Sequence, residues 1–397
     1  MTDELPVSPH CRVIVDNDYQ GDPDGLVALA HHLVSPANRV TVITSSFLDA
    51  RFPVASPRAE DGAVLARQLL EVMGGSSFPP VHAGSEVPFG DRSTSAASAA
   101  IVGEARRDDD LPLYLACGGP LTNVASALRD APDIASRLTL IWIGGSLDRS
   151  AFEYNCDTDQ DAAAFVFDQP DLAIHQFPLE TYRRCAYSVA ELELDLSCCG
   201  LLGHWLWSHF TNPPDWVRVG GVWPLGDSPT VVVTALSTES STATLLPPEG
   251  SRGAQRRIYT DVDFRLIVAD MLARFRLHES RLRKEMNSEL PSLLPRRDAG
   301  RKPRLLRPSG RPDAELRPGR RRGNGVRERL QHPPCLRPVP GLTRNRMVPA
   351  RPGAPDAPLP AGRHYAEFLQ VPAGSRIHHL PGRQESLLHR RGHRSEL

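Results

Sequence analysis

The segment "VIVDNDYQGDPDG", residues 13–25, places four aspartates at the end of an apolar run: Asp16, Asp18, Asp22 and Asp24. Carboxylates this close repel one another unless positive charge lies between them. Any one of them could instead cap a loop or a helix, because Asp is a favoured N-cap residue. Four together are harder to explain as caps. Hard oxygen ligands at this spacing suit Ca²⁺ or Mg²⁺, and the larger, irregular ligand shell favours Ca²⁺.

Apolar runs typical of buried strands alternate with segments of helical spacing in residues 1–280. Buried parallel strands read as continuous apolar runs, and the helices between them supply the crossovers. We therefore predict one α/β domain with an open, mostly parallel β-sheet flanked by helices. The expected strands are 12–16, 39–44, 113–117, 138–146 and 172–178, and the expected helices are 24–34, 61–75, 120–132 and 159–169.

Three unusual motifs follow three of the expected strands. "DNDYQGDPDG" follows the first strand, "GGPLTN" follows "LYLAC", and "GGS" with a later "EYN" follows "LTLIW". Ligands of open α/β sheets bind outside the carboxyl ends of the strands. The three motifs are therefore predicted to meet in one site.

Two other ligand-binding classes fit the sequence less well. A dinucleotide-binding domain needs a G-x-G-x-x-G turn after its first strand, and "DYQGDPDG" lacks it. A haloacid-dehalogenase-like phosphatase also opens with a strand and D-x-D, but it normally holds phosphate with a lysine, and residues 1–280 contain none. That phosphatase stays a minor alternative. The absence of nearby Cys or paired His argues against zinc.

A third class accounts for more of the chain. "VIVDNDYQGDPDG", "GGPLTNVASALRDAPDIASRLTLIWIGGS", "EYNCDTDQDAA", "PLGDSP" and "IYTDVDFRL" occur in this order. This pattern resembles the inosine-uridine-preferring nucleoside hydrolase family from about residue 12 to about residue 276. The resemblance implies an enzyme that hydrolyses the N-ribosidic bond of a purine or pyrimidine nucleoside. It also implies Ca²⁺ dependence, an open α/β fold and, for many members, a homo-oligomer.

Residue roles carry over from the same resemblance, beginning with the metal. Asp18 would bind Ca²⁺ and act as general base for the metal-bound water. Asp24 and Asp227 would be further carboxylate ligands, and Thr122 would offer its backbone carbonyl. Such an ion lowers the pKa of its water and orients the ribose diol.

The sugar would contact a second group of residues. The resemblance implies that Asp22 holds ribose hydroxyls and that Glu153 and Asn155 bind the 5′ side of the sugar. Positive charge grows on the sugar as the glycosidic bond breaks, as it does in glycosidases. A ring of carboxylates would stabilise that charge.

Three departures from the family pattern bear on the site. Pro23 separates two aspartates that are usually adjacent, so Asp22 and Asp24 could trade roles. The second strand often ends in an Asn that touches the sugar, and here the candidates are Ser46 and Asp49. Gly226 stands where a His often protonates the leaving base. A non-catalytic or weakly active sugar-binding relative is therefore the main alternative.

Several aromatic and histidine residues have structural as well as functional readings. Trp223 could stack on a base, although a half-buried loop aromatic is the simpler reading, and Trp142 is expected in the core. His31 and His32 are adjacent on a predicted helix and so point in different directions. We expect one of these histidines to be packed and the other solvated, with neither bound to a metal.

Charge divides the chain at residue 280. Residues 281–397 contain 24 Arg and 2 Lys against 10 Asp or Glu, with 17 Pro, whereas residues 1–280 are net acidic. The second segment has no sustained hydrophobic period, so we predict a largely disordered basic tail. Its Arg/Pro/Gly/His bias also resembles a GC-rich gene read in a shifted frame. Without interleaved aromatics or a known module, it gives little reason to expect nucleic-acid binding.

The remaining features indicate the cellular setting. The start "MTDELPVSPH" has no apolar targeting region, and no run approaches membrane-spanning length. The seven cysteines show no CxxC spacing, so reduced, mostly core residues are expected. We therefore predict a cytoplasmic enzyme whose partner is a small-molecule nucleoside.

Overall fold

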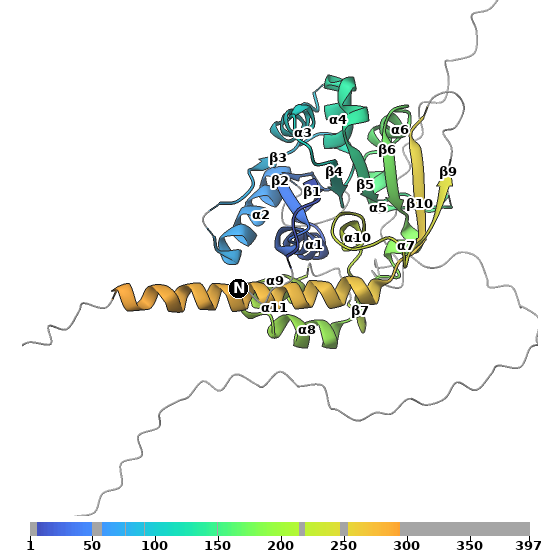
Figure 1. Ribbon diagram of the computed structural model, residues 1–397. Coiled ribbons are helices and arrows are strands. Elements are labelled where there is room, and N and C mark those ends of the chain that lie inside the picture. The colour runs from blue at the N-terminus through green and yellow to red at the C-terminus, as the bar shows by residue number, and fades with distance from the viewer. Residues whose placement is uncertain are drawn as a thin grey trace, which may run out of the picture.

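A computed structural model gives the fold of the protein (Figure 1). It describes residues 6–49, 58–75, 77–90, 92–148, 150–213, 219–246 and 253–293, and the side chains of the last range as far as residue 285. The expected tail beyond residue 293 lies outside the described residues.

An eight-stranded sheet forms the centre of the described structure. Its strand order is β3-β2-β1-β4-β5-β6-β10-β9, and every neighbouring pair is parallel except β10 and β9. In chain order the strands are β1 (Cys11–Asn17), β2 (Asn38–Ser45), β3 (Val81–Ala83), β4 (Leu113–Cys117), β5 (Thr139–Ile143), β6 (Ala173–Phe177), β9 (Thr242–Leu246) and β10 (Gln255–Asp261). The predicted open, mostly parallel sheet is confirmed.

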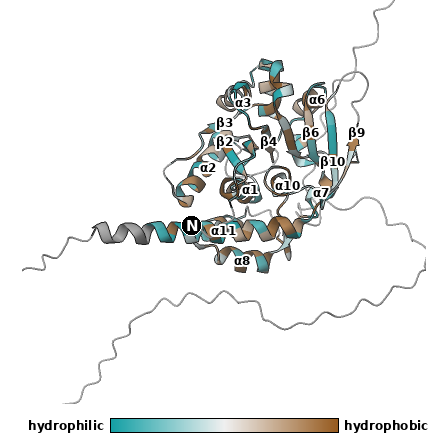
Figure 2. Cartoon of the chain, viewed as in Figure 1, coloured by the Kyte–Doolittle hydropathy of each residue, from teal (hydrophilic) through white to brown (hydrophobic). Residues whose placement is uncertain are grey.

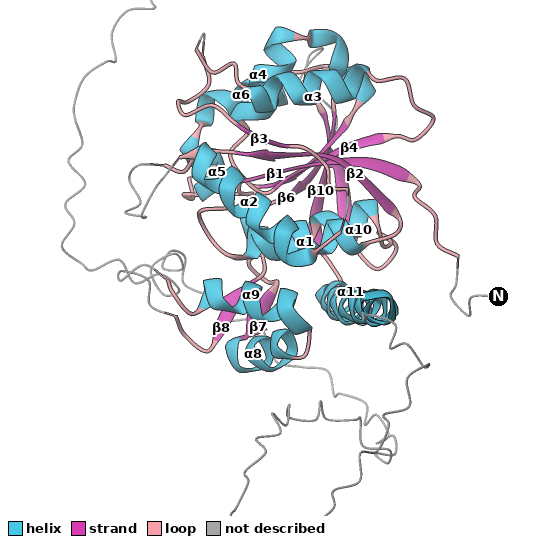
Figure 3. Cartoon of the chain, turned by 90° about the vertical axis from the view of Figure 1, so that its left-hand side faces the viewer, coloured by secondary structure: helices cyan, strands magenta, loops and turns pink. Residues whose placement is uncertain are grey.

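Helices cover both faces of this sheet (Figure 3). On one face, α3, α4 and α6 pack against the strands around Trp142, which is fully buried as expected. On the other face lie α1, α2 and α10, with α9 and α11 outside them. The helices on the first face are α3 (Ala96–Arg106), α4 (Thr122–Asp130) and α6 (Gln160–Phe167). Those on the second are α1 (Asp24–Val34), α2 (Ala59–Met73), α9 (Gly200–Phe210), α10 (Thr230–Thr234) and α11 (Phe264–Leu293).

A small lobe lies below the second face. In it, β7 (Ala186–Ser188) pairs antiparallel with β8 (Val222–Pro224), and α8 (Val189–Ser197) packs on α9. Three short helices complete the described chain: α5 (Tyr154–Thr158), α7 (Leu179–Tyr182) and the 3-10 helix Pro132–Arg137. Sequence periodicity did not predict this lobe, because its strands are too short to give a period of two.

Helix α11 closes the second face because it is amphipathic where it meets the body. Hydrophobic and hydrophilic residues alternate around it in Figure 2, and Ile267, Met271 and Phe275, spaced four residues apart, are fully buried. The helix continues to Leu293, so the expected domain boundary at residue 280 falls within it. No helix among the described residues has the length and apolar character needed to cross a bilayer.

The two adjacent histidines of α1 differ from expectation, since His31 and His32 are both buried and neither is solvated. The prediction failed because α1 is covered by α11 on one side and by α10 on another. His31 Nε2 lies 3.0 Å from Asp270 of α11, and His32 Nε2 lies 2.9 Å from the Thr230 hydroxyl of α10. Burial lowers the pKa of His32 to about 3, so this ring is neutral.

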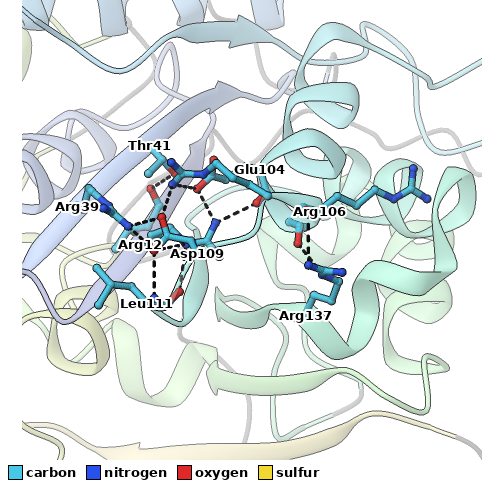
Figure 4. Close-up of polar contacts among 11 residues, drawn as sticks. Arg12, Arg39, Thr41, Glu104, Arg106, Asp109, Leu111 and Arg137 are labelled. Carbon is cyan, nitrogen blue, oxygen red and sulfur yellow. Dashed lines mark hydrogen bonds and ion pairs between the residues drawn. The ribbon is translucent and has the colours of Figure 1, made fainter.

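An ion-pair network fastens the amino ends of the central strands, away from the motifs (Figure 4). Arg12 of β1 is 4% exposed and donates to a Glu104 carboxylate oxygen at 2.8 Å and to the Glu104 carbonyl at 3.0 Å. Arg39 of β2 donates to Asp109, which also lies 3.8 Å from Arg12. Each buried charge therefore has a counter-charge.

Breaking this network should destabilise the fold without touching the motif loops. Glu104→Ala leaves the buried Arg12 guanidinium without its nearest carboxylate, which costs about 3 kcal/mol of unfolding free energy. Urea denaturation measures the loss. Arg106→Ala is the matched control, since the Arg106–Asp133 pair is exposed on the same helix and should matter little. Equal stability of the two variants would contradict the assignment.

Candidate active site

The three motifs meet where the strand order reverses. β1 lies between β2 and β4, so the chain leaves β1 toward one edge of the sheet and later returns to β4 on its other side. This is the topological switch point at which open α/β sheets bind ligands. The carboxyl end of β1 carries the aspartate loop, and the end of β4 carries Gly118 and Gly119.

Asp16 serves the scaffold of this site. It is fully buried, and its carboxylate accepts hydrogen bonds from Thr44 Oγ1 at 2.6 Å, Ser46 Oγ at 2.8 Å and Asn123 Nδ2 at 2.8 Å. These donors come from β2, the turn after it and α4. Burial raises the pKa of Asp16, and the hydrogen bonds oppose that shift. Asp16 therefore ties the end of β1 to β2, to the turn after β2 and to α4.

Asp18, two residues later, has the opposite surroundings. Its backbone N–H is fixed by Asn17 Oδ1 at 2.8 Å, but no other described residue donates a hydrogen bond to its carboxylate. Asp18 is 8% exposed, and burial followed by the charge of Asp227 raises its pKa well above the usual value. Its carboxylate thus faces the site with its oxygens unused by the described protein.

Asp24 and Asp227 are joined directly, although 203 residues separate them. Asp24 is the first residue of α1, and its Oδ2 accepts the Asp227 backbone N–H at 3.1 Å. Asp227 Oδ2 in turn accepts Asn17 Nδ2 at 2.9 Å. Each carboxylate keeps its Oδ1 without a hydrogen-bond donor among the described residues. The predicted meeting of the aspartate loop with "PLGDSP" is therefore present.

The carboxylates Asp18, Asp24 and Asp227 raise the free energy of one another's ionised forms. Burial raises the pKa of Asp24 well above its usual value, and the charges of Asp227 and Asp22 add to the shift. Burial also raises the pKa of Asp227 to about 7. No ion pair in the described part of the chain includes any of these aspartates. Charge is thus concentrated here without a protein counter-charge.

This donor set fits a hard divalent cation in charge and in chemistry. Unused carboxylate oxygens at the mouth of the site are the ligands that Ca²⁺ and Mg²⁺ prefer. Within the described residues, however, no group of three His, Cys, Asp or Glu side chains could hold a metal ion by itself. A cation at this position would therefore also need carbonyl or water oxygens, as Ca²⁺ sites commonly do.

Asp22 lies outside this group of carboxylates. It is exposed, and its Oδ1 accepts the indole N–H of Trp223 at 2.7 Å. Pro23 occupies the N-cap position of α1, so it separates the exposed Asp22 from the buried Asp24. The two aspartates flanking Pro23 consequently have different environments.

The "EYN" motif is held beside the ends of β4 and β5. Glu153 is 1% exposed, and its carboxylate accepts Gly145 N at 2.6 Å, Tyr182 Oη at 2.8 Å, Cys156 N at 2.9 Å and Asn155 N at 3.3 Å. Asn155 Nδ2 donates to the carbonyls of Gly118 and Ile143. Asn155 therefore bridges two strand ends, with its Oδ1 free of donors in the described structure.

Thr122 begins α4 directly after the "GGP" turn. Its hydroxyl donates to Asp159 Oδ2 at 2.5 Å, and Asp159 also caps α6 by accepting Ala162 N. The Thr122 side chain thus fixes α4 against α6. Its predicted role concerned the backbone carbonyl and stays a prediction.

The departures from the family pattern have structural counterparts. Ser46 is committed to Asp16, and the backbone N–H of Asp49 lies 3.4 Å from Tyr154 Oη. At Gly226, a Cβ would meet the Tyr182 ring at 3.0 Å and Asp24 Oδ2 at 3.3 Å. Tyr182 therefore occupies the space into which a side chain at 226 would extend.

Two supporting asparagines were missed by sequence reasoning. Asn17 orients both Asp18 and Asp227, and Asn123 holds Asp16. Both lie inside motifs already singled out, "DND" and "LTN". The signal in the sequence was the presence of a neutral hydrogen-bond donor next to crowded carboxylates or next to a predicted ligand.

Gly118 offers a direct test of this packing. A Cβ there would lie 2.3 Å from Asn17 Nδ2 and 2.7 Å from the Asp227 carboxylate carbon, so Gly118→Ala must push these groups apart. We expect a loss of about 2 kcal/mol of unfolding free energy, measured by urea denaturation.

Gly103→Ala is the control for the Gly118 variant. Gly103 lies in α3 with no atom within 4 Å of its would-be Cβ. Alanine there should stabilise the helix by about 0.5–1 kcal/mol. Unchanged stability in Gly118→Ala would refute the tight packing of Asn17 against Asp227.

Solved structures of nucleoside hydrolases share this fold. An inosine-guanosine nucleoside hydrolase matches with a TM-score of 0.54 at 19% identity, covering 67% of this chain and 98% of that one. A plant nucleoside hydrolase, PpNRh1, matches with a TM-score of 0.52 at 17% identity, covering 68% and 99%. An inosine-uridine preferring nucleoside hydrolase from Bacillus anthracis matches with a TM-score of 0.50 at 16% identity, covering 67% and 99%. The comparison with curated protein sequences gives no match.

The sequence itself carries the family assignment. The profile of the family described as inosine-uridine preferring nucleoside hydrolase matches residues 13–263, which include the aspartate loop, "GGPLTN", "EYN" and Asp227. Its members hydrolyse the N-glycosyl bond of nucleosides and depend on a metal ion. With the motifs gathered at one switch point and the profile spanning all of them, the chain belongs to the inosine-uridine preferring nucleoside hydrolase family.

Proposed function

We propose that this protein hydrolyses the N-ribosidic bond of ribonucleosides to free base and ribose, in a Ca²⁺-dependent reaction with Asp18 as general base. The supporting observation is the Asp18 carboxylate, which receives no hydrogen bond from another described residue and lies near Asp24 and Asp227 at the switch point. Asp16, in the same loop, is fully engaged by the scaffold and is not assigned this role.

Asp18, Asp24, Asp227 and the backbone carbonyl of Thr122 would hold the cation. When bound, Ca²⁺ supplies the positive charge that acidifies a water and orients the ribose diol. Asp18 takes the proton of the attacking water, which it can do because its oxygens are not spent on other donors. Asn17 positions both aspartates for this step, because it accepts the Asp18 backbone N–H and donates to the Asp227 carboxylate.

The sugar would lie between Asp22 and the "EYN" motif. Asp22 accepts from ribose hydroxyls, and Asn155 faces the 5′ side. The Glu153 carboxylate already accepts four hydrogen bonds from the protein, so its contribution to the 5′ side is to fix the loop that carries Asn155. The carboxylates oppose the positive charge that develops on the sugar ring as the bond to the base breaks.

Position 226 is glycine, so no histidine at this position can protonate the leaving base. Tyr182 fills that space, and its hydroxyl donates to Glu153. Nucleosides whose base can leave without being protonated should therefore be preferred. The rates of ribose release from a panel of purine and pyrimidine nucleosides measure this preference. Cytoplasmic location and assembly into a homo-oligomer remain further proposals drawn from the sequence.

Asp18 and Asp16 should separate catalysis from folding. Asp18→Asn keeps the side-chain shape but cannot accept a proton, so kcat for ribose release should fall about 10³-fold with the unfolding free energy retained. Asp16→Asn puts an amide NH₂ group in place of one carboxylate oxygen that accepts buried hydrogen bonds, so it should cost about 1–3 kcal/mol of stability. Free ribose is measured from a nucleoside panel, with and without EDTA.

The same assay can overturn the proposal. Unchanged turnover in Asp18→Asn would refute its role as base. Ribose binding by the wild-type protein without ribose release from any nucleoside would favour the sugar-binding alternative. Phosphate release from phosphomonoesters would support the phosphatase.

Calcium should stabilise the folded protein, because it relieves the repulsion among buried carboxylates. At a hundredfold excess of Ca²⁺ over its Kd, the gain is about 2.7 kcal/mol, or a rise in Tm of about 5–10 °C. Asp227→Asn should abolish the rise, whereas Asp133→Asn, which alters an exposed ion pair, should keep it. A scanning calorimeter measures both variants. Equal Ca²⁺ responses in the two would exclude Asp227 as a ligand.

A further inference from the structure

The Trp223–Asp22 contact has no role in the reaction described so far. The indole N–H of Trp223 donates to Asp22 Oδ1 at 2.7 Å across 201 residues of chain. It joins the small lobe to the aspartate loop at the exposed rim of the site. A tryptophan indole can only donate, so this contact leaves the direction of the hydrogen bond unambiguous.

Asp22 depends on this contact because its own loop gives it little support. Pro23 is the N-cap of α1 and has no N–H to offer. The nearest local donor is Asp24 N, 3.5 Å from Asp22 Oδ1, at the limit of a hydrogen bond. Oδ2 receives no donor from the described residues. One oxygen of Asp22 is therefore fixed by Trp223, and the other is left for a ligand.

Trp223 is itself well anchored. It pairs with Tyr187 in the β7–β8 ladder, and its ring meets Phe210 of α9 edge-on, with centroids 5.3 Å apart. Phe210 is 5% exposed and belongs to the core cluster under α1. The indole N–H thus projects from a rigid support rather than from a free loop.

We propose that Trp223 is a positioning residue that holds Asp22 so that Oδ2 faces a ribose hydroxyl. The role deepens the proposed function and rests on it. Pro23 moves Asp22 out of the helix start that Asp24 occupies, and the small lobe supplies the missing support. Discrimination between ribose and deoxyribose would then depend on a residue 201 positions from Asp22.

Trp223→Phe tests the role, since it keeps an aromatic ring against Phe210 and removes the N–H. Loss of a hydrogen bond to a charged group should raise KM for a ribonucleoside about tenfold and change kcat little. The penalty should nearly vanish for whichever of the 2′-deoxy and 3′-deoxy nucleosides lacks the hydroxyl that Asp22 binds. It should also vanish in an Asp22→Asn background.

Trp205→Phe is the matched control, because Trp205 is a half-buried tryptophan of α9, the helix that carries Phe210, and its ring contacts His209. It should leave KM unchanged. A penalty from Trp223→Phe that is equal for ribonucleosides and both deoxynucleosides would show that Trp223 is merely structural and overturn the inference.

A second measurement does not depend on turnover. In protein labelled with ¹⁵N at its five tryptophan indoles, the Trp223 signal is identified by its loss in Trp223→Phe. Asp22→Asn should shift this signal and leave that of Trp205 in place. An unmoved Trp223 signal would refute the hydrogen bond. Absence of ribose release by the wild-type protein would instead refute the proposed function, with the indole signal still deciding whether Trp223 holds Asp22.

Discussion

The repulsion among buried carboxylates at the end of β1 is the constraint on which the site depends. Asp16, Asp18, Asp24 and Asp227 are all buried at the switch point, and no ion pair of the described residues neutralises them. Such a cluster costs free energy in the protein alone, because burial penalises each charge and each charge penalises the next. A bound metal cation, and the positive charge that develops on the sugar, would offset this unfavourable free energy.

Neutral donors make the cluster tolerable. Asn17, Asn123 and the backbone N–H of Asp227 hold individual carboxylate oxygens apart without cancelling their charge. A lysine or arginine in the same place would stabilise the folded protein more, but it would occupy the position that we propose for the metal ion. The two ends of the sheet illustrate the difference. At the amino end, the buried Arg12 is paired with Glu104, and at the carboxyl end the charges stay unpaired.

Packing around the cluster leaves little freedom. Gly118 lies against Asn17 and Asp227 so closely that a methyl group would displace them, and Tyr182 fills the space beside Gly226. His32, neutral and buried, binds Thr230, whose hydroxyl donates to the carbonyl of Asp227. The position of Asp227 is therefore fixed from its own loop, from α1 and from α10. This rigidity is the expected support for a site that must hold oxygen ligands in place.

The sequence by itself determined the class of fold, the family and the motifs that meet at the switch point. It could do so because buried parallel strands leave continuous apolar runs, and because motifs that follow successive strands share one edge of the sheet. Tertiary structure alone decided the surroundings of each aspartate. Asp16 and Asp18 look equivalent in "DND", yet one is saturated by donors from β2 and α4 and the other is left free. The burial of both His31 and His32, the small lobe and the Trp223–Asp22 contact likewise depend on contacts between segments far apart in sequence, which no local pattern records.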